Sequence, residues 1–444
     1  MGRGGGDNEI SPERLLYGGG IRVQGRNRQP LASWGEEENL WGTIETDRGA
    51  ACSLLREDGN RVVYWMDHEG PQINLLEDRR KDDMRWSVRL PGRATWLDRI
   101  TEVNGDMVAV WSKTGGKMGL GWIQPFADNT ITELAEFDPG DDRAALVSLG
   151  NQLLCASIKN GMLVTQVWNP AGGSTNTETG LGASRILTQG SGEERSMILV
   201  ASQFGGEPSL HVFDLETGAV EQTIQTSGEA ASASLARAGD GHWVISYRNG
   251  RGQALINDGS QEISLDSTTL NSTMSRDPEL GAHSYGPWSV SADDGSVYVA
   301  WANDQQGLGA SVELGKMPEH QGGSLRRTTI AQEAHHRVGE IRICPDSRGA
   351  RVAWKVVDAE SGEYEEIFDA AWSGEETSPR PVSIFRAQGN PDWGENPDQL
   401  IIESFDRDRM GQISILLSSY EDEEAADQID GPAKSGIFRR LLRT

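Results

Sequence analysis

Eight short apolar segments, each ending on Trp, Tyr or Ser, recur at a nearly constant spacing along the 444 residues. Each segment follows a turn rich in Gly, Asp or Asn, and their last residues lie 46, 46, 45, 45, 54, 53 and 64 positions apart. A step of this length, with one strand–turn–strand unit per step, is typical of a β-propeller blade. The segments are Val62–Trp65, Val108–Trp111, Leu154–Ser157, Leu199–Ser202, Val244–Tyr247, Tyr298–Trp301, Arg351–Trp354 and Ile415–Ser418.

The sequence around each segment predicts a four-stranded antiparallel blade. In the fifth unit, for example, strands at 232–235, 243–247 and 253–256 are separated by turns that contain Gly239 and Gly250. Such turns favour hairpins because Gly and Asn accept a positive φ. The 54 glycines and the hydrophobic share of 36% indicate many thin sheets rather than one large helical core. Four of the 14 tryptophans end a repeated segment and are expected to pack between blades: Trp65, Trp111, Trp301 and Trp354.

The two ends of the chain are expected to complete the same blade. The last unit has a first strand at 399–405 and a second at 412–418, after which the chain becomes acidic and polar. Strands from the N-terminal region, at 20–23 and 40–46, would supply what is missing and remove the exposed sheet edges. We therefore predict an all-β propeller of eight four-stranded blades over residues 20–420, with seven blades as the alternative. Residues 1–19 are expected to be flexible, and residues 421–444 to form an acidic and then basic tail.

Charge and composition narrow the classes of partner. The net charge is −26, from 67 acids and 41 bases, which argues against sequence-independent binding of nucleic acid. No run of apolar residues has transmembrane length, and the three cysteines are read as buried residues rather than a disulfide framework. The Gly-rich segment Met1–Asn8 resembles a linker that follows an export signal or lipid anchor. This favours the cell envelope or secretion, and a cytoplasmic location if Met1 is the natural start.

One stretch is similar to a known family. In Arg342–Trp354, RICPDSRGARVAW, a Pro-Asp turn and a Gly precede a small-apolar strand that ends on an aromatic residue. This resembles the propeller repeat of TolB-like and prolyl-oligopeptidase-type proteins. The chain departs from the pattern with Ser347-Arg348-Gly349 in place of a plain Gly, and the other units lack the Pro. The resemblance implies a propeller fold and, from the TolB-like relatives, protein binding. It does not identify any binding or catalytic residue in this chain.

No segment has the spacing of a catalytic or metal motif. Asp406–Asp408 with Gly411 has part of a calcium loop, but Leu417 stands where the terminal Glu would be. His335-His336 is the only histidine cluster, and neighbours on a strand point to opposite faces. We therefore predict no catalytic residue, no metal and no cofactor. A glycoside hydrolase stays open as an alternative, because 67 acids offer many carboxylate pairs.

The turns between the second and third strands of each blade carry the candidate binding residues. These turns lie on the face where propellers usually bind ligands, and they are basic in units two, three and five: Lys113, Lys117, Lys159, Arg248 and Arg251. In units one, six, seven and eight these turns are acidic and carry Asp67, Glu69, Asp304, Asp358, Glu360, Glu421 and Asp422. A face divided in this way suits the steering of a protein partner with complementary charge. We predict a non-enzymatic binding or scaffold protein, with a structural subunit of a larger assembly as a further alternative. The basic stretch Ile437–Leu442 is interpreted as a possible docking element, either a short amphipathic helix that docks on a partner or membrane surface or an ordinary docked or frayed chain terminus.

Overall fold

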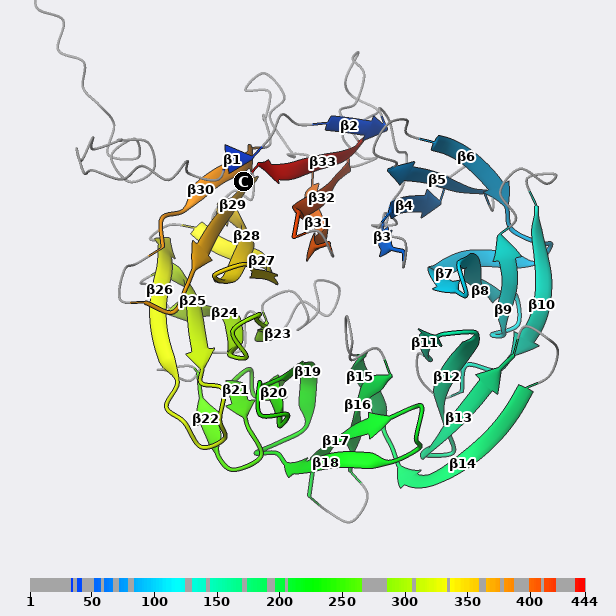
Figure 1. The fold of residues 1–444 in the computed structure, drawn as a ribbon, viewed down its shortest axis with the longest axis horizontal. Helices are drawn as coiled ribbons and strands as arrows, with labels where there is room; N and C mark the ends of the chain where they lie inside the picture. Colours follow the sequence, from blue (N-terminus) through cyan, green and yellow to red (C-terminus); the bar gives the residue numbers. More distant parts are fainter. Residues whose placement is uncertain are drawn as a thin grey trace, which may run out of the picture.

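The computed structural model is all-β: every regular element in the part of the chain that it describes is a strand (Figure 1). The structure describes residues 33–34, 38–41, 52–56, 60–66, 72–78, 84–123, 130–140, 144–169, 174–189, 196–203, 207–265, 286–305, 309–333, 336–358, 365–375, 379–386, 399–408, 411–420 and 436–443. In these ranges the strands form eight sheets, all with antiparallel pairing, which we number 1 to 8 in chain order. No helix long and apolar enough to cross a membrane occurs among them.

Sheets 1 to 4 each contain four strands in chain order. Sheet 1 comprises β3 (Cys52–Leu55), β4 (Arg61–Met66), β5 (Gln72–Asp78) and β6 (Met84–Arg89). Sheet 2 comprises β7 (Ala94–Val103), β8 (Asp106–Lys113), β9 (Met118–Ile123) and β10 (Ile131–Phe137). Sheet 3 comprises β11 (Ala145–Leu149), β12 (Gln152–Lys159), β13 (Met162–Trp168) and β14 (Ser174–Gly182). Sheet 4 comprises β15 (Arg185–Gln189), β16 (Met197–Ser202), β17 (Ser209–Asp214) and β18 (Val220–Gln225).

Sheets 5 to 7 repeat this plan, and sheet 8 differs. Sheet 5 comprises β19 (Ala230–Arg237), β20 (Trp243–Asn249), β21 (Ala254–Asn257) and β22 (Glu262–Ser264). Sheet 6 comprises β23 (Trp288–Ser291), β24 (Val297–Gln305), β25 (Gly309–Met317) and β26 (Arg326–Glu333). Sheet 7 comprises β27 (His336–Asp346), β28 (Gly349–Asp358), β29 (Glu365–Trp372) and β30 (Val382–Arg386). Sheet 8 contains β31 (Gln399–Arg407), β32 (Ile413–Tyr420), β33 (Gly436–Arg443), β1 (Ser33–Trp34) and β2 (Glu38–Trp41).

The eight repeated sequence segments are the second strands of the eight sheets. They fall within β4, β8, β12, β16, β20, β24, β28 and β32. The Pro-Asp stretch of the seventh unit forms the hairpin of β27 and β28, in which Asp346 pairs with Gly349 across a two-residue turn. The periodicity therefore reports a real structural repeat.

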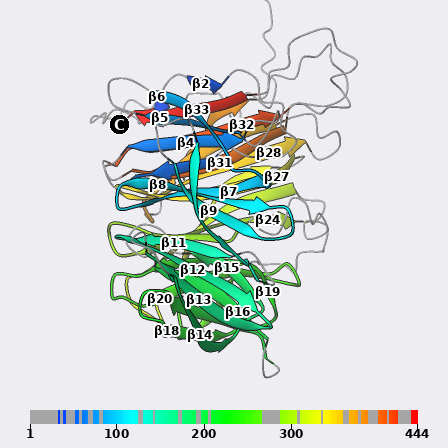
Figure 2. The same ribbon diagram turned by 90° about the vertical axis from the view of Figure 1, so that its right-hand side faces the viewer.

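The sheets are arranged radially around a common centre. The first strand of each sheet lies innermost and the later strands lie progressively outward (Figure 1). These innermost strands contact one another in a closed cycle: β3, β7, β11, β15, β19, β23, β27, β31 and back to β3. Seen from the side, neighbouring sheets pack face to face as successive layers (Figure 2). This arrangement is a β-propeller, and the number of eight blades stays the prediction made from the repeat.

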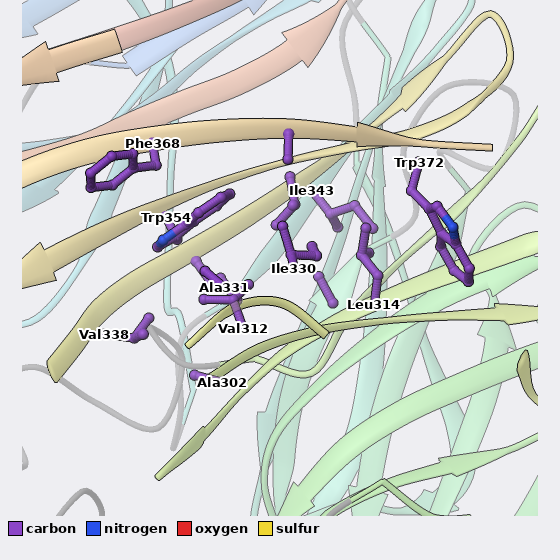
Figure 3. Close-up of a cluster of buried hydrophobic side chains, with 14 of the residues drawn as sticks. Ala302, Val312, Leu314, Ile330, Ala331, Val338, Ile343, Trp354, Phe368 and Trp372 are labelled. Atoms are coloured by element: carbon purple, nitrogen blue, oxygen red, sulfur yellow. The ribbon is translucent and has the colours of Figure 1, made fainter. Parts of the chain in front are cut away.

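The core lies between the sheets rather than at the centre of the ring. Between sheets 6 and 7, Leu314 and Val312 of β25 join Trp354 of β28 and Phe368 of β29 in one cluster (Figure 3). The rings of Trp354 and Phe368 stack with centroids 5.8 Å apart. The tryptophans at the strand ends are all buried, as expected: Trp65, Trp111, Trp301 and Trp354. Each interface of this kind buries apolar area that one sheet could not bury alone.

Strands from both ends of the chain complete sheet 8, which confirms closure by the two termini. β33 pairs with β32, and β1 and β2 both pair with β33. The details differ from the expectation, because Gly436–Arg443 is the third strand of this sheet and not a helix outside the propeller. Of the predicted N-terminal strands, only Leu40 and Trp41 lie in β2, while 20–23 and the boundary at residue 19 fall outside the described residues.

An ion pair joins the first and last sheets at the point of closure. Arg61 at the start of β4 donates to the carboxylate of Asp406 in β31, and Ser414 Oγ of β32 also donates to Asp406 at 3.4 Å. Asp406 is therefore engaged in a sheet-to-sheet contact. None of the three cysteines forms a disulfide with a residue that the structure describes; Cys155 and Cys344 are buried and Cys52 is half-buried.

Candidate partner-binding face

One face of the ring carries the turns between second and third strands together with the connections from one sheet to the next. We call it the loop face. Thr114 N, in the β8–β9 turn, donates to Arg93 O in the connection from sheet 1 to sheet 2 at 2.9 Å. Gly250 N, in the β20–β21 turn, donates to Glu229 O in the connection from sheet 4 to sheet 5 at 2.8 Å. These bonds hold the two kinds of loop side by side, so residues on them share one surface.

Lys113 and Lys117 lie on this face but are paired within their own sheet. Lys113 Nζ lies 2.7 Å from Glu133 Oε1 and 2.8 Å from Glu136 Oε2, and Lys117 Nζ lies 2.6 Å from Glu136 Oε1. The hydrogen bonds from Lys113 and Lys117 lower the pKa of Glu136 to about 2. The carboxylates of Glu133 and Glu136 in turn raise the pKa of Lys113. Both cations are thus balanced by acids of β10, which weakens the positive field they present to solvent.

Arg248 is a structural cation. Its side chain is buried at the end of β20, and its guanidinium donates to Gly286 O at 2.9 Å, Gly252 O at 2.6 Å and Ala302 O at 3.3 Å. These bonds tie the β20–β21 turn of sheet 5 to β24 and the start of sheet 6. A guanidinium that satisfies three carbonyls inside the protein has its donors committed to the fold.

Lys159 and Arg251 remain available on the loop face. Neither forms an ion pair with any residue that the structure describes. Lys159 is half-buried beside the Asn160-Gly161 turn, where both residues have positive φ of 52° and 73°. Arg251 is exposed on a turn held by the buried Asn249, whose Oδ1 accepts from Arg251 N and Gln253 N, each at 3.0 Å.

Arg93 is a third cation of this face that sequence reasoning missed. It is exposed in the connection between β6 and β7, has φ of 74° and forms no ion pair within the described part of the chain. The preceding Pro91-Gly92 is the local signal for a tight turn at this position. Arg93 was not predicted because the candidate residues were taken from the turns between second and third strands, whereas Arg93 lies in a connection between sheets.

The charged groups of the predicted acidic arc lie outside the part of the chain that the structure describes. Asp67, Glu69, Glu360, Glu421 and Asp422 lie outside the described residues, as do the side chains of Asp304 and Asp358. His335 is likewise outside them, as is the side chain of His336. Among the side chains that the structure does place, no three His, Cys, Asp or Glu residues gather in a metal-like group.

The comparisons with known proteins concern the fold alone. No family model and no curated protein matches the chain. Among solved structures it is similar to the Dos1 propeller, with 11% identity over 93% of this chain and 95% of that one and a TM-score of 0.48. It is also similar to the dihydro-heme d1 dehydrogenase NirN, with 15% identity over 76% and 67% of the two chains and a TM-score of 0.46. Hsv2 of Kluyvelomyces marxianus gives 10% identity over 77% and 99%, with a TM-score of 0.40.

Proposed function

We propose that this β-propeller is a non-enzymatic protein-binding module that presents its loop face to an acidic protein partner. The observation that supports the proposal is the set of three cations on that face, Arg93, Lys159 and Arg251, with no ion pair to any described residue. They stand on a chain whose net charge is −26. Isolated cations on an acidic protein select a partner by its local charge, mainly through the rate of association.

The TolB-like resemblance also supports a protein-binding role. It covers the Pro-Asp hairpin of the seventh unit and brings an expectation of protein binding rather than of a reaction. A scaffold role and a location in the cell envelope belong to this proposal as predictions.

The experiment compares two charge-reversed variants that differ only in the face they alter. The loop-face variant carries Arg93→Glu, Lys159→Glu and Arg251→Glu. The control carries Arg85→Glu, Arg326→Glu and Arg348→Glu, which are exposed cations near the opposite ends of the strands. Both variants change the net charge equally.

Each tagged variant is used to isolate partners from cells of the source organism, and the recovered proteins are quantified by mass spectrometry. We expect acidic proteins that the parent chain and the control retain to be lost from the loop-face variant. Their recovery should also fall as salt rises, because exposed charges are screened. Equal recovery on both variants would contradict the proposal.

A further inference from the structure

A cavity of about 580 Å³ opens on the loop face between sheets 3 and 4, and none of the three cations Arg93, Lys159 and Arg251 is among its described lining residues. Its wall on sheet 4 is formed by the end of β16 and the start of β17, at Ser202 and Ser209. Leu181, near the end of β14, lines it from sheet 3. The volume lies within the roughly 300–1,000 Å³ of sites that hold small molecules.

The cavity lies where one face of sheet 4 changes from apolar to polar along its length. Three successive cross-strand pairs of β16 and β17 share this face: Ile198 with Phe213, Val200 with His211, and Ser202 with Ser209. Ile198, Val200 and Phe213 pack against sheet 3 in a buried cluster. The pair Ser202 and Ser209 follows on the same face but is small and polar, and both residues line the cavity.

A chain of hydrogen bonds runs along the polar end of this face. Ser209 Oγ and His211 Nε2 are 3.1 Å apart, and His211 Nδ1 and Thr223 Oγ1 are 2.9 Å apart. Partial burial lowers the pKa of His211, which keeps the imidazole neutral at pH 7. A neutral imidazole donates from one nitrogen and accepts at the other. In one tautomer Ser209 accepts from the ring and has its own proton to offer, and in the other it donates to the ring and offers lone pairs.

The charge of the lining excludes several classes of ligand. No Lys or Arg lines the cavity among the residues that the structure describes, so a phosphate or carboxylate would find no counter-charge from them. Glu207 is the one carboxylate in the described part of the lining, which is too few for a divalent cation held by protein oxygens. One carboxylate is also short of the pair that glycoside hydrolysis requires. The other described lining residues supply hydroxyls, an imidazole, an amide, the backbone of Gly182 and the apolar Leu181.

We propose that this cavity between sheets 3 and 4 is a binding site for a neutral, polyhydroxylated ligand of the carbohydrate class. Sugar hydroxyls both donate and accept, as Ser209 beside His211 does. The Gln225 amide and the Glu207 carboxylate offer further partners, and the C–H groups of a sugar ring would lie on Leu181. The site does not depend on the loop-face proposal and can be tested without a protein partner.

The test measures binding of named sugars to the full chain by saturation-transfer NMR and by calorimetry. The probes are glucose, galactose, mannose, xylose and maltose, with glucose 6-phosphate and glucosamine as charged comparators. We expect at least one neutral sugar to bind at millimolar concentration or tighter, and glucose to bind better than glucose 6-phosphate, whose phosphate would meet Glu207 and no described cation.

Variants then locate the binding. Ser209→Ala and His211→Phe should each weaken it about 3- to 10-fold, the effect of one neutral hydrogen bond. Leu181→Trp should abolish it by filling the space, and His242→Gln, on a turn at the other end of the strands, should leave it unchanged. Thermal unfolding of every variant establishes that it is folded. The proposal is overturned if no neutral sugar binds the parent chain, if glucose 6-phosphate binds better than glucose, or if folded Ser209→Ala and Leu181→Trp both bind as the parent does.

Discussion

At the scale of single residues, the strand-end tryptophans show how far the sequence defines the packing. Their burial followed from their repeated position, because a large apolar side chain at the end of an inner strand has only the neighbouring sheet to pack on. The small residues that make room for them could not be recognised in the same way. Gly119 pairs with Trp111 across β8 and β9, and a Cβ on Gly119 would lie 2.3 Å from Trp111 Cε2.

Gly119→Ala is therefore expected to destabilise the protein. The added methyl must displace a fully buried indole, which costs about 1–3 kcal/mol in a close-packed core. Chemical denaturation followed by tryptophan fluorescence measures the change. Gly92→Ala is the matched control, since nothing lies within 4 Å of a Cβ at that position. Identical unfolding midpoints for the two variants would show that the indole moves aside at no cost.

Ion pairs were the part of the candidate site that the sequence could not reveal. Lys113 meets Glu133 and Glu136, which are 20 and 23 positions away and become neighbours only once β8, β9 and β10 lie side by side. Arg248 was read as a surface cation because it adjoins a turn, yet its carbonyl partners at Gly286 and Ala302 come from another sheet. A charged residue beside a turn can be assigned to the protein surface only once the contacts that the next sheet makes with it are known.

The pKa of Glu136 gives a prediction on pH. A carboxyl whose folded pKa falls from 4.5 to about 2 contributes stability that is present above pH 4.5 and is lost as the pH falls towards 2. Because Glu136 is exposed, the contribution is small, and the direct measurement is an NMR titration of its carboxyl carbon. Lys113→Met with Lys117→Met should return the pKa towards 4.5. Lys159→Gln, which removes a cation that is not paired with Glu136, should leave it low, and a low value in the double variant would refute the pairing.

At the scale of secondary-structure elements, the regular repeat predicted the second strands of all eight sheets but not β33. Ile437 and Leu441, and likewise Phe438 and Leu442, are four positions apart, which is the spacing of a helix face. The register with β32 and β2 shows that this segment is instead a strand between them. Local periodicity favoured a helix, while the edge of β32 offers backbone partners that local sequence does not report.

Deleting residues 436–444 is expected to open sheet 8. The deletion exposes the edge of β32 and removes Leu442, which is 4% exposed in the cluster of sheets 7 and 8. Loss of one such buried Leu alone costs about 2–5 kcal/mol. Size-exclusion chromatography should show self-association, and a synthetic peptide with the sequence of 436–443 should restore the monomer. A peptide of scrambled sequence is the control, and a truncated chain that stays monomeric and equally stable would contradict the role of β33.

At the scale of the whole molecule, the excess of acid sets how stability responds to salt. The 41 bases can offset only part of the 67 acids, so the folded ring carries a strong mutual repulsion. Added salt screens this repulsion and also weakens the few ion pairs on the surface. We expect the first effect on the stability of the folded protein to be the larger one. The described pairs near the ring closure, such as Arg61 with Asp406, are largely sheltered from solvent on the arginine side.

We therefore expect the unfolding temperature to rise when NaCl increases from about 10 mM to about 150 mM, which shortens the Debye length from about 30 Å to about 8 Å. Differential scanning calorimetry measures the shift. A variant with Asp106→Lys, Glu178→Lys and Glu221→Lys, three exposed acids on sheets 2, 3 and 4, should be more stable at low salt and respond less. An unfolding temperature that falls with salt would show that ion pairs dominate instead.

The pairing of β1 and β2 with β33 also dictates when the protein can finish folding. On the ribosome, β2 emerges about 400 residues before β33, which at about 5–20 residues per second is a wait of roughly 20–80 s. Until then the seven complete sheets form an open arc, and the N-terminal strands have no partner to pair with. The nascent chain is most exposed to proteases and to other polysomes during this interval, and chaperones that shield strand edges would act on it then.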